Sequence, residues 1–273
     1  MFLRCKFIAL LVLSGITLSF ATGYADSDKY STSLESLAKQ MKRNGVDITP
    51  FYTHQKFAVY ENISEYFKKS AESEGIDPYI KAQKKGDTAE AERVLQEQYE
   101  KYKDTIGFNK KQKSLSPFIK QYYDQLSSSE KKYNIPMEII ASIIGLESQF
   151  GKITGNHFAF NVYVSMYVSG YRKEFAVSQL TELYKFAKKN NLDIFTFNSS
   201  YAGAIGPMQF LPWSLNRWFV GDDVFDMGSA ITSVANYLAH FKKKRGSLEK
   251  AIFAYNPSKL YCKAVVELAG YNK

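Results

Sequence analysis

The sequence contains little cysteine: only Cys5 and Cys262 occur among its 273 residues. Cys5 lies in an N-terminal segment that we expect to be removed, so the mature chain can form no internal disulfide. An exported chain of this length must then be stabilised by its hydrophobic core. Cys262 stands near Val265 and Val266, which favours a buried thiol over a nucleophile.

Motifs for metal binding, serine hydrolysis and nucleic-acid binding are also missing. The three histidines, His54, His157 and His240, have no partner at metal-ligand spacing, which argues against a metal-dependent amidase or peptidase. We therefore expect no metal and no other cofactor. No Gly-x-Ser-x-Gly elbow occurs. The net charge of +9 favours anionic partners, but no nucleic-acid-binding motif accompanies it, so no nucleic-acid partner is expected.

Long apolar runs are confined to the N-terminus. Residues 1–25 combine the basic Arg4 and Lys6 with an apolar run from Phe7 to Phe20 and a small-residue end, which is typical of a cleaved signal peptide. The run is shorter than the roughly 20 residues that span a bilayer, so a retained anchor is the weaker interpretation. Cys5 precedes the run and is not placed for lipid attachment. The sequence predicts a periplasmic or secreted protein, cut after Ala25.

The mature chain shows helical periodicity and almost no period-2 alternation, which predicts a mainly α fold. Residues 88–103 are rich in helix formers and poor in apolar residues, so we expect a solvated helix packed on one side. The lysine-rich residues 110–117 resemble a linker. We therefore predict an N-terminal helical region over 26–116 and a second helical domain over 117–273.

Residues 136–151 form the most informative predicted helix. One apolar face carries Ile139, Ile140, Ile143 and Ile144. Glu147 lies three to four residues further and continues this face. A carboxyl there is partly desolvated, which raises its pKa and favours the protonated form that a general acid needs. The alternative is a helix-end carboxylate that pairs with a lysine or caps a neighbour. Gly145 within the helix indicates close approach of another backbone.

Three later segments offer polar groups beside small or aromatic residues. Residues 198–212 contain two glycines that let a ligand approach the backbone, while Ser200 and Gln209 supply hydrogen bonds. A helix over 227–241, capped by Asp226, places Tyr237 off its apolar stripe. Residues 251–257 end in a proline-limited turn that presents Tyr255 and Asn256. Taken singly, each segment is equally consistent with an ordinary turn or core helix.

Taken together and in order, five segments resemble the motifs of the membrane-bound lytic transglycosylase B family of lytic murein transglycosylases. They are Ile-Ile-Gly-Leu-Glu-Ser-Gln-Phe-Gly, Gly-Tyr-Arg-Lys-Glu-Phe, Ser-Tyr-Ala-Gly-Ala-Ile-Gly-Pro-Met-Gln-Phe-Leu-Pro, Ser-Val-Ala-Asn-Tyr-Leu and Ala-Tyr-Asn-Pro. The resemblance covers about residues 118–270. The segment before Pro117 shows no clear likeness.

The resemblance implies a lysozyme-like catalytic domain over 117–273 that cleaves the bond between N-acetylmuramic acid and N-acetylglucosamine in peptidoglycan and leaves 1,6-anhydro ends. Glu147 would be the catalytic acid and then the base. The matching motif positions also imply substrate-binding residues: Ser200, Gln209, Arg172, Tyr237, Tyr255 and Asn256. The implied partners are peptidoglycan glycan strands, with proteins of the cell-wall machinery as an open possibility, and the protein is expected to be a monomer.

Besides the segment before Pro117, the sequence departs from the family pattern in a second place. Typical members carry a calcium-binding loop of EF-hand type before the helix that begins near residue 227, but residues 218–226 are too short and lack alternating oxygen ligands. No calcium site is therefore expected. A second catalytic carboxylate is not obvious, and Glu174 and Glu182 are weak candidates. A hydrolytic muramidase and a non-catalytic peptidoglycan-binding protein remain as alternatives.

Overall fold

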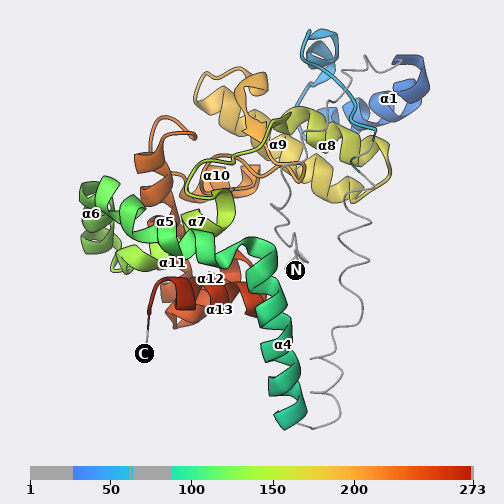
Figure 1. Ribbon diagram of the computed structural model, residues 1–273. Helices are drawn as coiled ribbons and strands as arrows, with labels where there is room; N and C mark the ends of the chain where they lie inside the picture. Colours follow the sequence, from blue (N-terminus) through green and yellow to red (C-terminus); the bar gives the residue numbers. More distant parts are fainter. Residues whose placement is uncertain (1–26, 62, 64–87, 272–273) are drawn as a thin grey trace. The chain divides into compact units, whose positions relative to one another are not determined.

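The computed structural model describes residues 27–61, 63 and 88–271. The expected signal peptide, residues 1–25, lies outside these ranges. The described chain is mainly helical, as the periodicity predicted, and divides into two compact units (Figure 1). Within the described ranges, no helix is long and apolar enough to cross a membrane.

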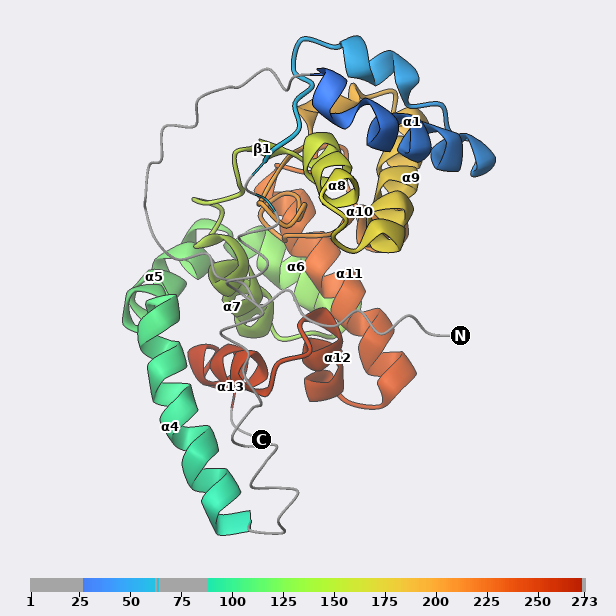
Figure 2. The same cartoon turned by 90° about the vertical axis from the view of Figure 1, so that its right-hand side faces the viewer.

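The first unit contains the described residues 88–153 and 220–271. Its helices are α4 (Thr88–Ile106), α5 (Phe108–Gln121), α6 (Tyr123–Tyr133), α7 (Met137–Ser148), α11 (Met227–Arg245), α12 (Leu248–Tyr255) and α13 (Lys259–Leu268). Helix α7 is central, because α5, α6, α11 and α13 all pack against it (Figure 2). Every residue of α7 from Ile139 to Ser148 is buried, so its apolar sequence reflects burial on all sides.

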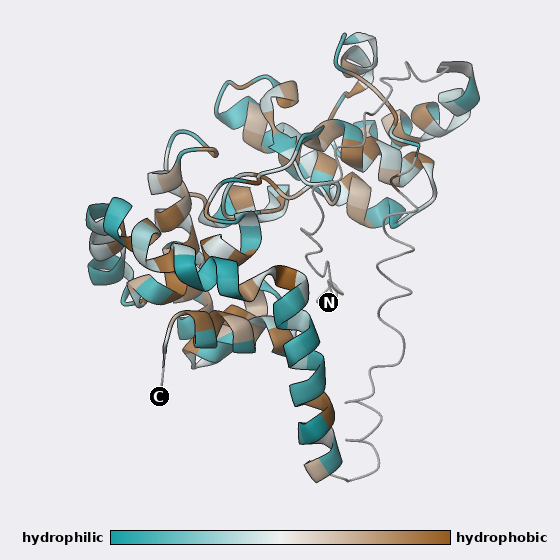
Figure 3. Ribbon diagram, viewed as in Figure 1, coloured by the Kyte–Doolittle hydropathy of each residue, from teal (hydrophilic) through white to brown (hydrophobic). Residues whose placement is uncertain are grey.

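Helix α4 confirms the expected solvated helix. Its N-terminal half extends beyond the other helices of this unit in both views, and its ribbon is coloured mainly hydrophilic in Figure 3. Tyr99 is fully buried on the packed side. The ammonium groups of Lys103 and Lys263 lie 5.0 and 4.4 Å from its ring centre, which is within cation–π range.

The second unit contains the described residues 27–61, 63 and 154–219. Its elements are α1 (Ser27–Arg43), η1 (Thr49–Thr53), β1 (His157–Phe158), α8 (Ala159–Val168), α9 (Lys173–Lys189), η2 (Ile194–Thr196), β2 (Asn198–Ser199) and α10 (Pro212–Trp218). Strands β1 and β2 pair antiparallel, with His157 opposite Ser199. The nearly fully buried α8 packs against α1 and α9, and α9 packs against α10.

The prediction of a linker over residues 110–117 is wrong, because these residues belong to α5. A proline inside a helix removes one hydrogen bond and costs about 3 kcal/mol. Here the helix continues past Pro117 because Phe108, Lys111 and Phe118 are buried on one side of it. The boundary expected between 116 and 117 thus falls within α5, whereas the two compact units divide the chain after residues 153 and 219.

Candidate functional site

Glu147 lies at the C-terminal end of α7 and is only 3% exposed. The helix ends because Gln149 and Phe150 both adopt left-handed backbone conformations, with φ of 51° and 59°. This turn brings the Phe150 ring back against Gly145, where a Cβ atom would overlap the ring. Gly145 therefore accommodates an aromatic side chain, and the expectation of another backbone at this position is wrong.

Among the described residues, the Glu147 carboxyl has one hydrogen-bond partner. Tyr261 on α13 donates its hydroxyl proton to Glu147 Oε1 at 2.7 Å. Burial raises the pKa of Glu147 from 4.5 to about 7, and the Tyr261 hydrogen bond acts in the opposite direction. No ion pair involves Glu147 in the described part of the chain, so the alternative of a lysine-paired helix-end carboxylate does not hold there.

Three tyrosines belong to the surroundings of this carboxyl. Burial raises the pKa of Tyr102, Tyr255 and Tyr261, and the negative charge of Glu147 raises each of them further. These phenols therefore stay protonated, and Tyr261 donates its hydrogen bond as a neutral group. Sequence reasoning named Tyr255 and missed Tyr102 and Tyr261. The only signal for Tyr261 was its position three residues after the capping Ser258.

Tyr237 and Asn256, both expected at the site, also belong to the first unit. The Tyr237 ring packs edge-on against Tyr255 at 4.8 Å between centroids, and its hydroxyl donates to the Ala254 carbonyl at 2.7 Å. Asn256 is 7% exposed, and its Oδ1 atom has no hydrogen-bond partner among the described residues. A buried acceptor without a partner costs about 1–3 kcal/mol, which a ligand donor at this position would recover.

The 198–212 segment forms a tight turn in the second unit. Ser200 N–H donates to the Ala204 carbonyl at 2.9 Å, and Ser200 Oγ accepts from Ala204 N–H at 3.2 Å. A Cβ at Gly203, whose φ is +82°, would overlap the Tyr163 ring, so glycine is required there. The turn thereby presents Ser200 in a defined geometry.

Gln209 follows in the same turn with a left-handed backbone, φ 49°. Its Nε2 atom donates to the carbonyls of Gly206 at 2.9 Å and Thr154 at 3.3 Å. These bonds fix the amide. Its Oε1 atom is buried and has no partner among the residues that the structure describes. Like Asn256, Gln209 thus carries a buried acceptor that no described residue satisfies.

Arg172 occupies the N-cap position of α9 in the second unit, without a side-chain capping bond. Its guanidinium lies 4.0 Å from the Phe175 ring centre, and its positive charge lowers the pKa of the neighbouring Tyr163 against the larger effect of burial. Tyr163 in turn donates to the Gly203 carbonyl at 2.8 Å. The second unit thus brings Arg172 near the turn that carries Ser200, while Glu147, Tyr237, Tyr255 and Asn256 belong to the first unit.

The remaining candidates have structural surroundings. Glu182 pairs with Arg217 at 3.0 Å, and Glu174 is exposed in the first turn of α9. His54 stacks on Phe195 at 4.2 Å between ring centroids. Cys262 is only partly buried, which corrects the expected burial, and its pKa is raised to about 12 by desolvation.

The loop between α10 and α11 does not fit calcium. Asp223 Oδ1 accepts from Phe225 N–H at 2.8 Å, and Asp226 Oδ2 caps α11 by accepting from Ser229 N–H at 2.7 Å. Both carboxylates are thus engaged by the backbone. Over the described ranges, no three His, Cys, Asp or Glu side chains gather as a metal site would require.

The helical fold around a buried carboxyl places the chain in the lysozyme-like class of helical proteins. The family model described as "Transglycosylase SLT domain" matches residues 32–249, and the chain belongs to this family. The match extends well before Pro117, into the region where the sequence motifs showed no likeness.

One curated relative is the membrane-bound lytic murein transglycosylase B of Escherichia coli (strain K12), which is 32% identical over 127 residues. The matched segment is 44% of this chain and covers only 35% of that protein. The lytic transglycosylase Slt35 of Escherichia coli, solved in complex with calcium, has a TM-score of 0.64 at 19% identity, over 90% of this chain and 94% of that one.

SltB3 of Pseudomonas aeruginosa, solved in complex with NAG-anhNAM-pentapeptide, has a TM-score of 0.65 at 18% identity. The likeness covers 88% of this chain and 78% of SltB3. At these identities the structural likeness establishes the fold.

Proposed function

We propose that this chain is a peptidoglycan lytic transglycosylase, a glycan lyase that cleaves the bond between N-acetylmuramic acid and N-acetylglucosamine. One observation carries the proposal: Glu147 is a buried carboxyl without a cationic partner in the described chain, and its pKa is about 7. Near neutral pH such a group is present in both forms, so it can donate a proton in one step and accept one in the next. Family membership supports the reaction class.

In the first step Glu147 protonates the glycosidic oxygen, and the bond from C1 of the muramic sugar to that oxygen breaks. The positive charge that develops at C1 is stabilised by the oxygen of the sugar's own acetamido group. In the second step the Glu147 carboxylate takes the proton of the 6-hydroxyl, whose oxygen attacks C1. The product is a 1,6-anhydro ring. No water is consumed, so one carboxyl suffices.

The remaining residues would hold the glycan. Asn256 Oδ1 and Gln209 Oε1 are buried acceptors without partners among the described residues, which suits the hydroxyl and amide donors of an N-acetylated sugar. Ser200 adds a hydroxyl, and Tyr237 with Tyr255 adds aromatic surface. Arg172 would reach the acetamido group or the peptide. The relative SltB3 binds a ligand that contains both sugar and pentapeptide.

Digestion of purified sacculi followed by mass spectrometry tests the reaction. Products with 1,6-anhydro ends are expected, each lighter by one water than a hydrolytic product. Reducing ends would instead identify a hydrolytic muramidase. Inert wild-type protein that still binds sacculi would identify a non-catalytic peptidoglycan-binding protein.

Replacing Glu147 with glutamine tests the residue. The amide keeps the shape and can still accept from Tyr261, but it cannot donate the proton, so turnover should fall about 10²–10⁴-fold. Glu182→Gln is the matched control, because its carboxylate pairs with Arg217, and it should retain activity. Retained activity in Glu147→Gln would refute the acid/base assignment.

The proposed activity also implies a location outside the cytoplasm. The N-terminal pattern of residues 1–25 supports export to the periplasm or the medium after cleavage, where peptidoglycan strands are accessible. We propose that the protein acts there as a monomer, and proteins of the cell-wall machinery are the partners to test. Mass spectrometry of the exported protein should give an N-terminus at Asp26. An N-terminus at Met1 would indicate a retained anchor.

A further inference from the structure

Positive charge is concentrated in one part of the first unit. Residues 242–263 contain seven Lys or Arg residues and one acidic residue, Glu249, in a chain whose net charge is +9. The last turn of α11 alone carries Lys242, Lys243, Lys244 and Arg245. The site around Glu147 uses none of these cations.

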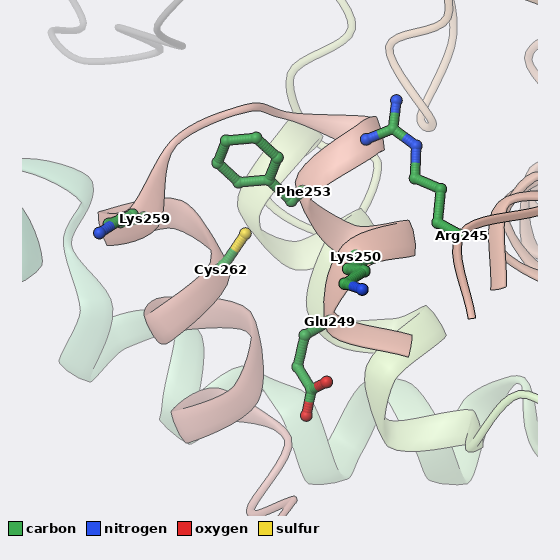
Figure 4. Close-up of a pocket in the computed structure, with 6 residues that line it drawn as sticks. All are labelled: Arg245, Glu249, Lys250, Phe253, Lys259 and Cys262. Atoms are coloured by element: carbon green, nitrogen blue, oxygen red, sulfur yellow. The ribbon is translucent and has the colours of Figure 1, made fainter. Parts of the chain in front are cut away.

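A cavity of about 530 Å³ opens among these charges, and we call it the basic cavity. It is lined by Arg245, Glu249, Lys250, Phe253, Lys259 and Cys262 (Figure 4). The Phe253 ring from α12 and the Cys262 sulfur from α13 point toward one another at its centre, with the charged side chains around them. The neighbouring Tyr261 donates instead to Glu147, so α13 separates the basic cavity from the catalytic carboxyl.

Two cations at the rim of the basic cavity have no ion-pair partner among the described residues. Arg245 and Lys250 form no ion pair with the described residues, and Arg245 lies 5.3 Å from the Phe241 ring centre. Phe253 is 39% exposed between them. Cations alone would suit any polyanion, whereas the exposed Phe253 ring between them adds apolar area that a partner with an apolar layer beside its anionic groups would cover.

We propose that the basic cavity and the adjoining end of α11 form a docking surface for a membrane that contains anionic phospholipid. Phosphate groups would lie against Arg245 and Lys250, and Phe253 would enter the boundary between headgroups and acyl chains. This inference does not rest on the proposed function. It implies that the protein is held near a bilayer by reversible contacts of its folded surface.

Cosedimentation of the exported protein with vesicles tests the proposal. Vesicles of phosphatidylcholine with phosphatidylglycerol should bind at least about tenfold more tightly than pure phosphatidylcholine, and added salt should weaken the binding. The double variant Arg245→Gln, Lys250→Gln should bind about 30-fold more weakly. The matched control, Lys185→Gln, Lys189→Gln, removes the same charge from exposed positions of α9 and should bind like the wild type.

The Phe253→Ser variant distinguishes a membrane partner from a soluble polyanion. Loss of the ring should weaken binding to the anionic vesicles about fivefold, since part of a phenylalanine surface leaves water on insertion. Binding to soluble polyphosphate should be weaker than to vesicles and should not depend on Phe253. Equal binding to both vesicle types, an equal loss in the α9 control, or polyphosphate binding as tight as vesicle binding would overturn the proposal.

A labelling experiment locates the contact. Cys262 lines the basic cavity, so anionic vesicles should slow its alkylation, followed by mass spectrometry of the peptide that contains it. Unchanged alkylation in the presence of bound vesicles would place the contact elsewhere and refute the docking surface. Sacculus digestion by the variants provides an independent measure of folding, and a failure of the proposed function would leave the vesicle results interpretable.

Discussion

At the residue scale, two opposing effects set the proton affinity of Glu147. Burial raises its pKa, and the hydroxyl of Tyr261 stabilises the carboxylate and limits that rise to about 7. A charged group gains about 1.5–3 kcal/mol from a hydrogen bond in a buried site. Tyr261 therefore adjusts the pH range in which Glu147 can act as an acid.

Tyr261→Phe should raise the pKa of Glu147 by about one unit, because only the charged form loses its donor. The descending limb of the pH profile of kcat/KM, which reports ionisation of the acid, should move to higher pH. Tyr237→Phe is the control, since the Tyr237 hydroxyl donates to the Ala254 carbonyl. An unchanged or lowered limb in Tyr261→Phe would contradict the assigned role.

Burial of Glu147 could be predicted because the isoleucines before it define an apolar face that local periodicity reveals. The residues that contact its carboxyl could not be predicted. Tyr261 is 114 positions away in the chain, and Tyr102 belongs to a helix whose sequence predicts one packed side but not what it packs against. Gly145 is a second example. The glycine predicted that another group approaches the helix closely, and only the fold shows that this group is the Phe150 ring.

At the element scale, a single cap orients the helix that carries Tyr261. Ser258 Oγ accepts from Tyr261 N–H at 3.3 Å at the start of α13. Ser258→Ala should cost about 1 kcal/mol of the free energy of unfolding, measured by urea denaturation. Ser247→Ala removes the equivalent cap of α12, at 3.2 Å, and should cost about the same. Sacculus digestion should fall further in Ser258→Ala than in Ser247→Ala, because only α13 carries Tyr261. Equal activities of the two variants would contradict a role of the α13 cap in orienting Tyr261.

The short loop before α11 leads to a prediction about metal. Because the backbone engages Asp223 and Asp226, addition of calcium should not raise the Tm of the protein, and a chelator should not lower it. Scanning calorimetry with calcium and with chelator measures this. A Tm that rises with calcium concentration would show a site that the described residues do not form.

Helix α5 shows where prediction from composition fails. Several lysines and Pro117 make residues 110–117 resemble a linker, whereas burial of Phe108 and Phe118 on one side stabilises a helix despite the proline. Helix α11 was predictable to its first residue, because Asp226 both begins the pattern and accepts from Ser229 N–H. Local caps are thus readable from sequence, and tertiary packing that overrides composition is not.

At the scale of the whole molecule, Glu147 makes stability depend on pH. A carboxyl whose folded pKa is raised from 4.5 to about 7 favours the folded state when protonated. Its contribution is complete below pH 4.5, is lost as pH rises through 7, and amounts to about 3 kcal/mol. The raised pKa that keeps Glu147 protonated near neutral pH is thus accompanied by reduced stability in alkaline solution.

Glu147→Gln should remove this dependence. In urea denaturation the variant should match the wild type near pH 4 and exceed it by about 3 kcal/mol near pH 9, because the neutral amide carries no desolvation penalty. The difference between the two proteins isolates Glu147 from the other titrating groups. Equal stabilities at both pH values would mean that the carboxyl is not desolvated.

The overall class of the molecule was predictable, and its division was not. Helical periodicity predicted the mainly α fold, and five ordered motifs indicated the family that matches residues 32–249. The prediction of a boundary near residue 117 assumed that each domain is one continuous segment. The first unit instead combines residues 88–153 with 220–271, and composition contains no signal for such pairing of distant segments.

This discontinuity has a consequence during biosynthesis. Residues 154–219 separate α7 from the helices that complete its unit, so the Glu147 carboxyl cannot reach its buried, hydrogen-bonded state until α13, which carries Tyr261, has been synthesised. A prematurely terminated chain that ends before α13 lacks Tyr261 and cannot desolvate the acid in this way. The environment of Glu147 thus depends on chain segments from both sides of residues 154–219.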